Sequence, residues 1–459
     1  MWQNVFVKTN LYILTEERPK ANVVKKILDI YCEKNCKNTE ITTINIIPTI
    51  EHLVFAGFTV DGYKINGIEK IILKIVSGYS SFVDYLLFES ENLPNEDEPF
   101  KNLKIAIEET KTDSTESRNT AAGQRATKFA FLNEYKNIFS CNFDKLMLYN
   151  DQKKQNISDT DSVKFMKKCM KTSGVIFSGD YSNDLKPFTS IGELINEKNK
   201  MRQPPKGNIP IRISSEDNIT YISGTLSKPK DKGNIGHDPN IGQIIGISSA
   251  LRHLGLKEKI VIREHSVKQE VVDKMKGNKF MIAANFLNIG LKGIKLPYIE
   301  LSKKYWKYQN KTEKLSSILL HMICNNIGYD LVYENHAGSE RGYFYDHLNN
   351  KITVEKKYKK TNINLPDYVF RDEISKKIYI VEAEMHENLE KGIRQIQSFD
   401  LFEDLYVKKF YKNYSTERVI CLSNSKKDFY HPKVIFSIDP NNVITVNELT
   451  PIKIKNFIL

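Results

Sequence analysis

The chain has 459 residues, 40% of them hydrophobic, and a formal net charge of +12 with an isoelectric point near 9.0. This length allows about two or three domains with sizeable cores, and the lack of any apolar run of eighteen residues argues against a membrane span. The positive charge favours a polyanionic partner, of which nucleic acid is the commonest, although an AT-rich coding sequence alone also enriches lysine.

The cysteines and the first residues point to a reducing compartment. The opening stretch MWQNVFVKTN lacks the basic-then-apolar layout of a signal peptide. The six cysteines are scattered, and Cys32 and Cys36, four apart, have no second Cys or His pair that would complete a zinc site. We therefore expect reduced thiols in a cytoplasmic protein.

The N-terminal part, residues 1–180, is expected to hold buried strands followed by a helix. Apolar runs at residues 71–76 and 82–88 are typical of core strands. The stretch KIAIEETK, residues 104–111, begins as another such strand but ends in two carboxylates, a hydroxyl and an ammonium. A helical pattern follows at residues 120–135.

The middle part, residues 181–300, combines loops with a helix and a strand. Residues 196–212, NEKNKMRQPPKGNIPIR, are basic, carry three prolines and predict an exposed loop or linker. Residues 233–242, GNIGHDPNIG, also have loop composition. They lack the GK[ST] ending and the GxGxxG spacing of phosphate loops, so no nucleotide cofactor is expected. A helix at residues 243–254 and a strand at residues 259–263 follow.

The C-terminal part, residues 301–459, begins with a predicted helix at residues 312–327, where Leu, Ile and Met recur at helical spacing. Gly328 is placed to end it. Residues 333–346, YENHAGSERGYFYD, predict a hairpin or surface loop. The remaining expected elements are strands at residues 329–333, 365–370 and 377–384 and a helix at residues 388–401.

A charged constellation in the N-terminal part combines two strands. Asp84 opens the first strand within FVDYLLFES, and KIAIEETK is the second. Side chains i and i+2 share a strand face, so Glu109 and Lys111 point the same way while Glu108 points to the other face. Glu109 is preferred over Glu108 as the partner of Asp84 because it gives the E-x-K spacing.

The C-terminal part repeats this order in LPDYVFRDE followed by KIYIVEAE. Asp367 opens the first strand, and Glu382 and Glu384 share one face at the end of the second. A helix carrying a glutamine follows each constellation, with Gln124 after the first and Gln395 after the second. The shared order is a weak internal repeat.

The geometry of such a hairpin suits a hard cation. If the two strands splay at this end, the Asp and the first Glu converge, and carboxylate oxygens are the ligands that Mg²⁺ prefers. A bound Mg²⁺ can hold a phosphate oxygen and lower the pKa of a water, while a nearby Lys can orient that water. The alternative is that Asp84 begins a turn and that Glu109 and Lys111 form an exposed same-face pair; the second occurrence weighs against it.

At these residues the sequence resembles the PD-(D/E)xK nuclease superfamily, and within it the type II restriction endonucleases. The matching residues are Asp84, Glu109 and Lys111 in the first copy and Pro366, Asp367, Glu382 and Glu384 in the second. The helix at residues 312–327, followed by GYDLVYEN, also resembles the first helix and strand of that superfamily. The resemblance covers about half of the chain, and its motifs are moderately specific.

The resemblance implies an α/β fold with two PD-(D/E)xK-like cores, each a mixed central sheet flanked by helices, joined by a middle recognition region. It implies Mg²⁺-dependent hydrolysis of double-stranded DNA that leaves 5′-phosphate and 3′-hydroxyl ends. The metal would be held by Asp84 and Glu109 in one core and by Asp367 and Glu382 in the other. Lys111 would assist the attacking water at the first core.

Two positions depart from the family pattern. Val83 stands where the superfamily often has Pro, and Glu384 stands where it usually has Lys. Glu384 would serve the second site, as a ligand of a second metal or as a base, but it cannot supply a positive charge. The second core is therefore either active or kept for DNA binding alone.

Polar residues around the first core are candidates for DNA contact. Arg pairs with guanine, and Gln or Asn with adenine, through two hydrogen bonds. The candidates are Arg118, Gln124, Arg125, Lys128 and, in the second core, Gln395. A solvated helix face is the alternative for the first four.

Two cores in one chain suggest that each cuts one strand, in a protein that is a monomer or a homodimer. Two rival functions remain. One is a DNA-binding protein with one or both nuclease-like cores inactive. The other is a DNA repair or RNA nuclease that uses the same chemistry.

Overall fold

A computed structural model gives the fold of the chain. The described residues are 9–16, 19–51, 55–78, 82–110, 118–138, 146–150, 160–179, 185–201, 209–226, 239–274, 278–308, 312–336, 343–355 and 357–458. The protein is mixed α/β, with several mixed sheets flanked by helices. Among the described residues, no helix combines the length and the apolar character that crossing a membrane requires.

The chain divides into two compact units. Unit 1 comprises Met1–Ser77 and Tyr308–Leu459, and unit 2 comprises Gly78–Lys307. This division differs from the three expected parts, because the first 77 residues group with the C-terminal part and residues 78–180 group with the middle part.

The N-terminal segment of unit 1 consists of strands and one helix. Its elements are β1 (Thr9–Thr15), α1 (Ala21–Lys34), β2 (Thr39–Glu51), β3 (Phe55–Ile65) and β4 (Ile68–Gly78). Strands β2, β3 and β4 are antiparallel neighbours, and β1 pairs with β4 in parallel. The described part of α1 buries one apolar side, including Val24, Leu28 and Tyr31.

The C-terminal segment of unit 1 forms an eight-stranded sheet in the order β16-β15-β14-β19-β20-β21-β22-β23. Its strands are β14 (Asp330–Glu334), β15 (Tyr343–Tyr345), β16 (Lys351–Thr353), β19 (Tyr368–Asp372), β20 (Lys377–Met385), β21 (Ser415–Ser423), β22 (Val434–Ile438) and β23 (Ile444–Val446). Strands β19 and β20 are antiparallel, and β20, β21 and β22 are parallel. A separate small hairpin joins β17 (Lys357–Tyr358) to β18 (Thr361–Asn362).

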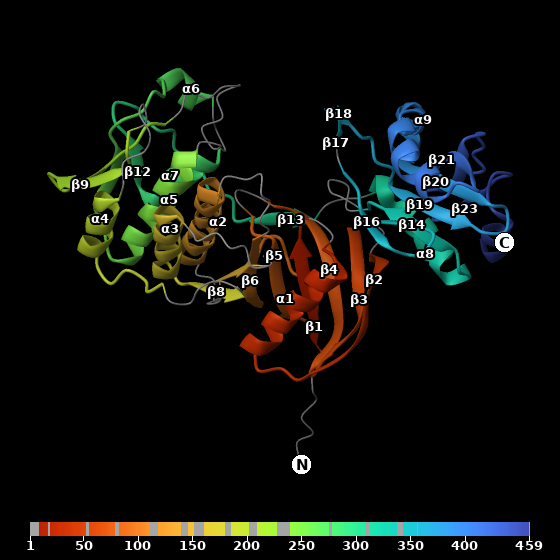
Figure 1. Cartoon of the computed structure of the whole chain (residues 1–459), viewed down its shortest axis with the longest axis horizontal. Coiled ribbons are helices and arrows are strands. Elements are labelled where there is room, and N and C mark those ends of the chain that lie inside the picture. Colours follow the sequence, from red (N-terminus) through yellow and green to blue (C-terminus); the bar gives the residue numbers. More distant parts are fainter. Residues whose placement is uncertain are drawn as a thin grey trace, which may run out of the picture. The chain divides into compact units, whose positions relative to one another are not determined.

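Helices cover both faces of this sheet (Figure 1). They are η2 (Thr312–Lys314), α8 (Leu315–Ile327), η3 (His386–Asn388), α9 (Leu389–Gln397), α10 (Asp400–Phe402), η4 (Glu403–Val407), α11 (Lys408–Phe410) and α12 (Ile452–Ile458). Residues from α8, such as Leu320, pack with Tyr368 and Val381 on one face. Residues from α9, such as Ile396, pack with Val369 and Ile380 on the other face. Neighbouring residues of one strand thus enter different cores, as alternation requires.

Unit 2 begins with the strand order β5-β6-β7-β8. The elements are β5 (Tyr85–Ser90), β6 (Leu103–Thr110), α2 (Arg118–Ile138), β7 (Leu146–Asn150), α3 (Asp161–Thr172), β8 (Val175–Gly179) and α4 (Ile191–Lys200). Strands β5 and β6 form an antiparallel hairpin, whereas β7 and β8 are added in parallel, each after a helix.

The rest of unit 2 repeats this order of elements in a four-stranded sheet. Its elements are β9 (Arg212–Glu216), β10 (Ile219–Ser223), α5 (Pro239–His253), β11 (Lys259–Ile262), α6 (Gln269–Asp273), α7 (Lys279–Leu287) and β12 (Ile289–Leu291). Strands β9 and β10 form an antiparallel hairpin, and β11 and β12 follow in parallel, again after helices. The strand β13 (Trp306–Tyr308) comes where unit 2 ends in the sequence.

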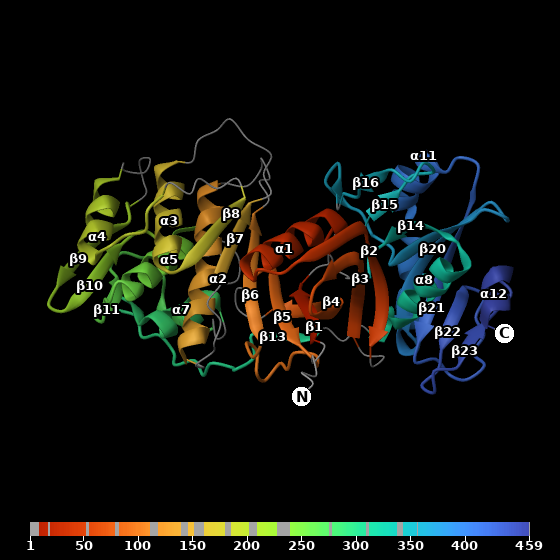
Figure 2. The same cartoon turned by 90° about the horizontal axis from the view of Figure 1, so that it is seen from below.

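Helices α2, α3 and α5 lie between the two sheets of unit 2 in both views (Figures 1 and 2). The backbones of α2 and α5 approach closely at Gly123 and Gly242. A Cβ added at Gly242 would lie 2.7 Å from the carbonyl carbon of Gly123, closer than real Cβ atoms come. Each of these glycines precedes a glutamine, Gln124 or Gln243, so the two helices meet through matching positions of their repeated order.

Most expected elements are present, with shifted boundaries in the middle part. Residues 196–200, expected in a loop, belong to α4, whose N-cap Ser190 accepts a hydrogen bond from the Glu193 amide at 3.1 Å. Residues 239–242, also expected in a loop, form the first turn of α5. Gly328 ends α8 in the left-handed conformation, as predicted, with φ 78°. The rest of the expected loop at 233–242 lies outside the described residues.

Candidate active site

The hairpin of β19 and β20 brings the three predicted carboxylates of unit 1 to one face of the sheet. Tyr368 pairs with Val381, so Asp367 and Glu382, the next residues toward the open end, lie opposite each other. Glu384 shares the face of Glu382 because it lies two residues further along β20. All three side chains are buried, and the Ala383 amide donates to Asp367 Oδ2 at 2.9 Å.

The cationic groups of this site come from helices and were missed in the sequence. Lys314, the last residue of η2, donates to Asp367 Oδ1. Lys391 of α9 donates to Glu384 Oε1 at 2.6 Å, with about half of its side chain exposed. At the position where the resemblance implies a Lys, Glu384 thus binds Lys391, while Lys314 binds Asp367. Lys391 follows Glu384 by seven residues and Lys314 precedes Asp367 by 53, and in both cases only the docking of the helix brings the lysine to the carboxylate.

Gln395 of α9 also points at the carboxylates. Its amide nitrogen donates to Glu382 Oε1 at 2.9 Å. We expected this residue to contact DNA, whereas the structure places its side chain on a predicted metal ligand. Helix α9 can approach β20 closely because residue 392 is glycine, where a Cβ would lie 3.0 Å from Glu384 Cγ.

Burial and mutual repulsion control protonation in this cluster. Burial raises the pKa of Glu382 well above its usual range, and the neighbouring charge of Asp367 raises it further. Burial lowers the pKa of Lys314, but the charges of Asp367 and Glu382 outweigh it, so the net direction is upward. The pKa of Lys391 is raised by its hydrogen bond to Glu384. The site therefore holds its lysines charged and disfavours a full set of ionised carboxylates.

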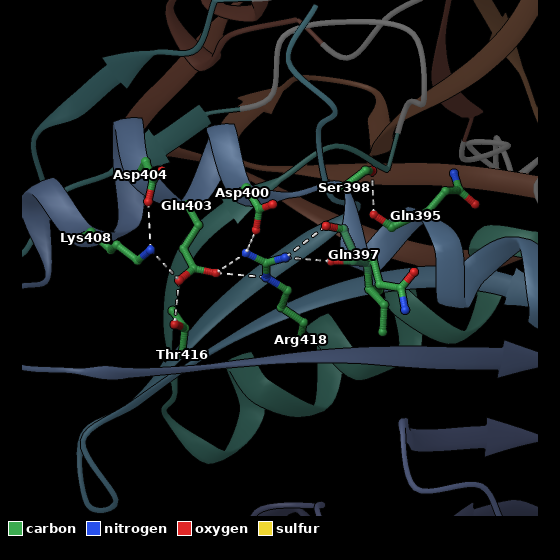
Figure 3. A network of polar contacts seen from close by, with 10 residues as sticks. Gln395, Gln397, Ser398, Asp400, Glu403, Asp404, Lys408, Thr416 and Arg418 are labelled. Atoms are coloured by element: carbon green, nitrogen blue, oxygen red, sulfur yellow. Dashed lines mark hydrogen bonds and ion pairs between the residues drawn. The ribbon is translucent and has the colours of Figure 1, made fainter.

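The C-terminal end of α9 is anchored by Arg418 of β21 (Figure 3). The guanidinium donates to the carbonyl oxygens of Ile396 and Gln397 at 3.1 and 3.2 Å, where a helix leaves its carbonyls unpaired. It also donates to Glu403 Oε2 at 2.9 Å and to Asp400 Oδ1 at 2.6 Å. These contacts fix the helix that carries Lys391 and Gln395.

The hairpin of β5 and β6 in unit 2 has the same register. Tyr85 pairs with Ile107, so Asp84 lies opposite Glu108. The Glu109 amide donates to Asp84 Oδ2 at 2.7 Å, as the Ala383 amide does to Asp367 in unit 1. Glu108 therefore corresponds to Glu382.

This register corrects the predicted first site. The Glu109 carboxylate lies on the other face of β6, where Tyr85 Oη donates to Glu109 Oε2 at 3.2 Å. Glu108, which we did not favour from the sequence, is the carboxylate that faces Asp84. It accepts a hydrogen bond from the Asp84 amide at 3.2 Å. The E-x-K spacing favoured Glu109 as the partner of Asp84. Because Tyr85 pairs with Ile107 and side chains alternate along a strand, the partner of Asp84 is Glu108 instead.

Helix α2 supplies the cations of the first site. Lys128 Nζ donates to both carboxylate oxygens of Glu108 at 2.8 Å and lies 3.6 Å from Asp84 Oδ1. Burial, followed by the charge of Asp84, raises the pKa of Glu108 to about 8, although Lys128 and Arg125 oppose this rise. A carboxyl group with this pKa is mostly protonated near neutral pH.

The other residues predicted near the first site have different outcomes. Lys128, expected to contact DNA, instead binds Glu108, and Arg125 is half-buried with its charge acting on the same carboxylate. Gln124 is exposed on α2, so its surroundings differ from those of the partly buried Gln395. Lys111 lies outside the described residues. Arg118 begins α2, but its side chain lies outside the described part of the structure.

The carboxylates of unit 1 fit a magnesium ion. Within the described part of the chain, Glu382 Oε2 and Glu384 Oε2 are buried and accept no hydrogen bond. Unsatisfied buried carboxylate oxygens are costly, and a hard dication that takes oxygen ligands would satisfy them. The donor set in unit 2, Asp84 and Glu108, is also composed of oxygen atoms, with Lys128 as the nearest cation.

The third hairpin of this kind, β9 and β10, carries no carboxylates at the equivalent positions. Arg212 pairs with Ser223, so the positions of the Asp and the Glu are taken by Ile211 and Gly224. A Cβ at Gly224 would lie 3.2 Å from Ile211 Cγ1, which places the two residues opposite each other. This segment has the same order of strands and helices, but its hairpin carries no acidic side chain at the two positions equivalent to the Asp and the Glu.

Comparison with known proteins gives no relative: no family model, no curated protein and no solved structure matches the chain.

Proposed function

We propose that the protein is a type II restriction endonuclease that hydrolyses phosphodiesters of double-stranded DNA with Mg²⁺. One observation carries the proposal: in each unit a strand-opening aspartate lies opposite a buried glutamate across an antiparallel hairpin, beside a lysine from a helix. The pattern occurs twice with the same register. A structural ion pair would account for one such cluster, but the repetition supports a shared chemical task.

Each carboxylate pair has a defined part in this proposal. Asp367 and Glu382 would hold the metal in unit 1, and Asp84 and Glu108 would hold it in unit 2. When bound, the ion would polarise the phosphate and lower the pKa of the attacking water. Amide donation to Asp367 and Asp84 from the opposite strand fixes the orientation of these carboxylates.

The lysines supply the positive charge that the E-x-E motif lacks. Lys391 is half-exposed and bonded to Glu384, so it can turn toward a phosphate and stabilise the negative charge that develops during hydrolysis. Lys128 would supply this charge in unit 2, where it binds Glu108, the counterpart of Glu382. Lys314 is buried against Asp367 and therefore serves to position that carboxylate.

The segment of β9–β12 is proposed to recognise the target. It keeps the order of elements of the first half of unit 2 without the acidic pair, so it can contribute a DNA-facing surface without cutting. The net charge of +12 supports a phosphate-binding surface whose affinity falls with rising salt.

Digestion of a sequenced, genome-length DNA with Mg²⁺, followed by mapping of all ends, tests the function. We expect cuts at one recurring sequence, with 5′-phosphate and 3′-hydroxyl ends and no cleavage in the presence of EDTA. The double variant D84N/D367N should lose cleavage, whereas D61N, which changes an exposed carboxylate in β3, should retain it.

The same assay separates the rival functions. Sequence-specific binding by the wild-type protein without any metal-dependent cleavage would favour a DNA-binding protein with inert cores. Ends scattered at random, or preferential cleavage of RNA, would favour a repair or RNA nuclease. Cleavage that persists in D84N/D367N would show that neither candidate site is the active site.

The role of Lys391 has its own test. The variant K391A should lower the cleavage rate of the strand served by unit 1 by about 10²-fold, the scale on which one preorganised charged donor acts. DNA affinity measured in Ca²⁺ should change little, because the effect belongs to the reaction step. K412A, which removes an exposed lysine outside the site, should leave the rate unchanged. An equal loss in both variants would show only a general charge effect.

A further inference from the structure

Three metal-ligating side chains meet inside unit 1, away from the carboxylates of the candidate active site. They are His321, Glu334 and His336, with exposed fractions of 2%, 1% and 0%. One nitrogen or oxygen atom of each lies within 4.8 Å of the others. His321 Nδ1 and His336 Nε2 are 2.9 Å apart.

The fold brings these side chains together from two elements. Glu334 ends β14 and His336 follows two residues later, a spacing that directs both side chains to one side of an extended chain. His321 lies in α8 and faces them. Residues 333–346 were predicted as a hairpin or surface loop, and the antiparallel pairing of β14 with β15 makes them a hairpin. Composition did not indicate that Glu334 and His336 in this stretch would be buried.

The cluster and the candidate active site lie on different faces of the sheet. Glu334 pairs with Tyr368, whose side chain belongs to the core under α8. The Tyr368 ring stacks on His321, with centroids 4.7 Å apart, and holds the imidazole in place. Glu382 shares its face with Ile380, which belongs to the core under α9.

The donor set identifies the class of metal. Zn²⁺ is a borderline-soft ion that accepts two imidazoles and one carboxylate, whereas Mg²⁺ prefers oxygen ligands and keeps several waters. Tetrahedral Zn–N bonds of about 2.1 Å separate two nitrogens by about 3.4 Å. The rings of His321 and His336 would therefore move apart by a few tenths of an ångström. The Ser317 hydroxyl lies 3.3 Å from His336 Nδ1, the ring nitrogen that points away from His321, so it would orient the imidazole and a water would be the fourth ligand.

We propose that His321, Glu334 and His336 bind a structural zinc ion that fixes α8 to β14. The proposal is independent of the nuclease function. Its electrostatic basis is the balance of charge: a dication offsets the buried carboxylate and leaves both imidazoles neutral. The competing arrangement is a metal-free network in which the two imidazoles and the carboxylate share a proton.

The zinc site would also brace the candidate active site from the opposite side. Ser317 Oγ, beside His336, donates to the Lys314 carbonyl oxygen at 3.0 Å, and Lys314 binds Asp367. The Asn335 amide, between the proposed ligands Glu334 and His336, donates to the Asp367 carbonyl oxygen at 2.8 Å. Loss of the ion should therefore loosen Asp367 without removing any group from the site.

Metal analysis of the purified full-length chain tests the proposal directly. We expect one zinc per chain, lost in H321A and in E334Q and retained in H347A, which changes an exposed histidine beyond the cluster. Removal of zinc by a chelator should lower the melting temperature of the wild-type chain, and added Zn²⁺ should restore it. These measurements use no DNA, so their failure would not bear on cleavage.

A cysteine variant keeps the test decisive where an alanine variant does not fold. H336C replaces one zinc ligand by another, so it should retain the metal. With Co²⁺ in place of Zn²⁺, H336C should gain a thiolate-to-cobalt absorption band that the wild-type protein lacks. A wild-type chain without zinc whose melting temperature is unaffected by Zn²⁺ or chelator would overturn the proposal in favour of the proton-sharing network. Zinc content equal in wild type, H321A and E334Q would overturn it as well.

Discussion

At the scale of single residues, the two neighbouring glutamates of β6 have opposite surroundings. The Glu108 carboxylate binds Lys128 beside Asp84, whereas Glu109 accepts a hydrogen bond from Tyr85 on the other face. The variant E108Q should therefore reduce cleavage at the unit 2 site by about 10²-fold or more, since it replaces the carboxylate proposed to hold the metal by an amide. E109Q is its matched control and should change the rate much less. Single-turnover cleavage of end-labelled DNA measures both, and the reverse order would restore Glu109 as the active carboxylate.

The raised pKa of Glu108 gives stability a defined dependence on pH. Burial and the charge of Asp84 raise this pKa from 4.5 to about 8, so between these values the folded protein binds a proton that the unfolded chain has lost. The contribution of Glu108 to stability is full below pH 4.5 and is lost as the pH rises toward 8. E108Q should flatten the fall in melting temperature between about pH 5 and 8.5, unlike E69Q, which changes an exposed residue. Parallel curves for wild type and E108Q would contradict the assignment.

Part of the candidate site could be predicted from residue types, and part could not. Asp84, Asp367, Glu382 and Glu384 were found because strand ends with spaced charges are unusual. The choice between Glu108 and Glu109 needed the pairing of β5 with β6, since Ile105, Ala106 and Ile107 are all buried and their pattern marks neither face as the outer one. The lysines of the helices become visible only when the helices are docked.

At the scale of elements, the crossing of α2 and α5 depends on two glycines. The variant G242V would place side-chain carbon against the Gly123 backbone, where even a Cβ would be only 2.7 Å from the carbonyl carbon. We expect it to lower the free energy of unfolding by about 1–3 kcal/mol, as overpacking does. G192V in α4 is the control, because a Cβ there meets nothing within 4 Å. Urea denaturation measures the difference, and equal midpoints for the two variants would rule out a tight crossing.

Helices with regular apolar periodicity were predicted well, whereas helices whose beginning is marked only by a capping residue were not. The helix α8 and its end at Gly328 followed from apolar spacing and a terminal glycine. The prolines and charges of residues 196–212 obscured α4, although its beginning is marked by Ser190, which accepts from the Glu193 amide, and by Glu193, which accepts from the Thr189 amide. In the same way, Pro239 is suited to a first helical turn and marks the beginning of α5.

At the scale of the whole molecule, one chain carries two candidate sites, one in each unit. If each site cuts one DNA strand, D84N should leave an enzyme that nicks one strand, and D367N should leave one that nicks the other. Supercoiled plasmid should then accumulate as open circles, and strand-specific labels should identify the remaining cut. Linear product formed by either variant at the wild-type rate would exclude this division of work.

The three-part division predicted from composition shows the limit of reading domains along a chain. The predicted parts follow one another along the chain, with limits at residues 180 and 300, but the compact units join residues far apart in sequence. Long-range pairing, such as that of β1 with β4, decides which segments share a core, and local composition does not record it.

The acids and the cations of both candidate sites come from different types of element, which bears on when the proposed nuclease would become active. The carboxylates belong to hairpins, whereas Lys128 and Lys391 lie on the helices α2 and α9. A chain whose hairpins have formed but whose helices are not docked would therefore keep its carboxylates and lack the lysine beside them. On the proposed function, such a chain would be harmless to the genome of its own cell until the helix docks.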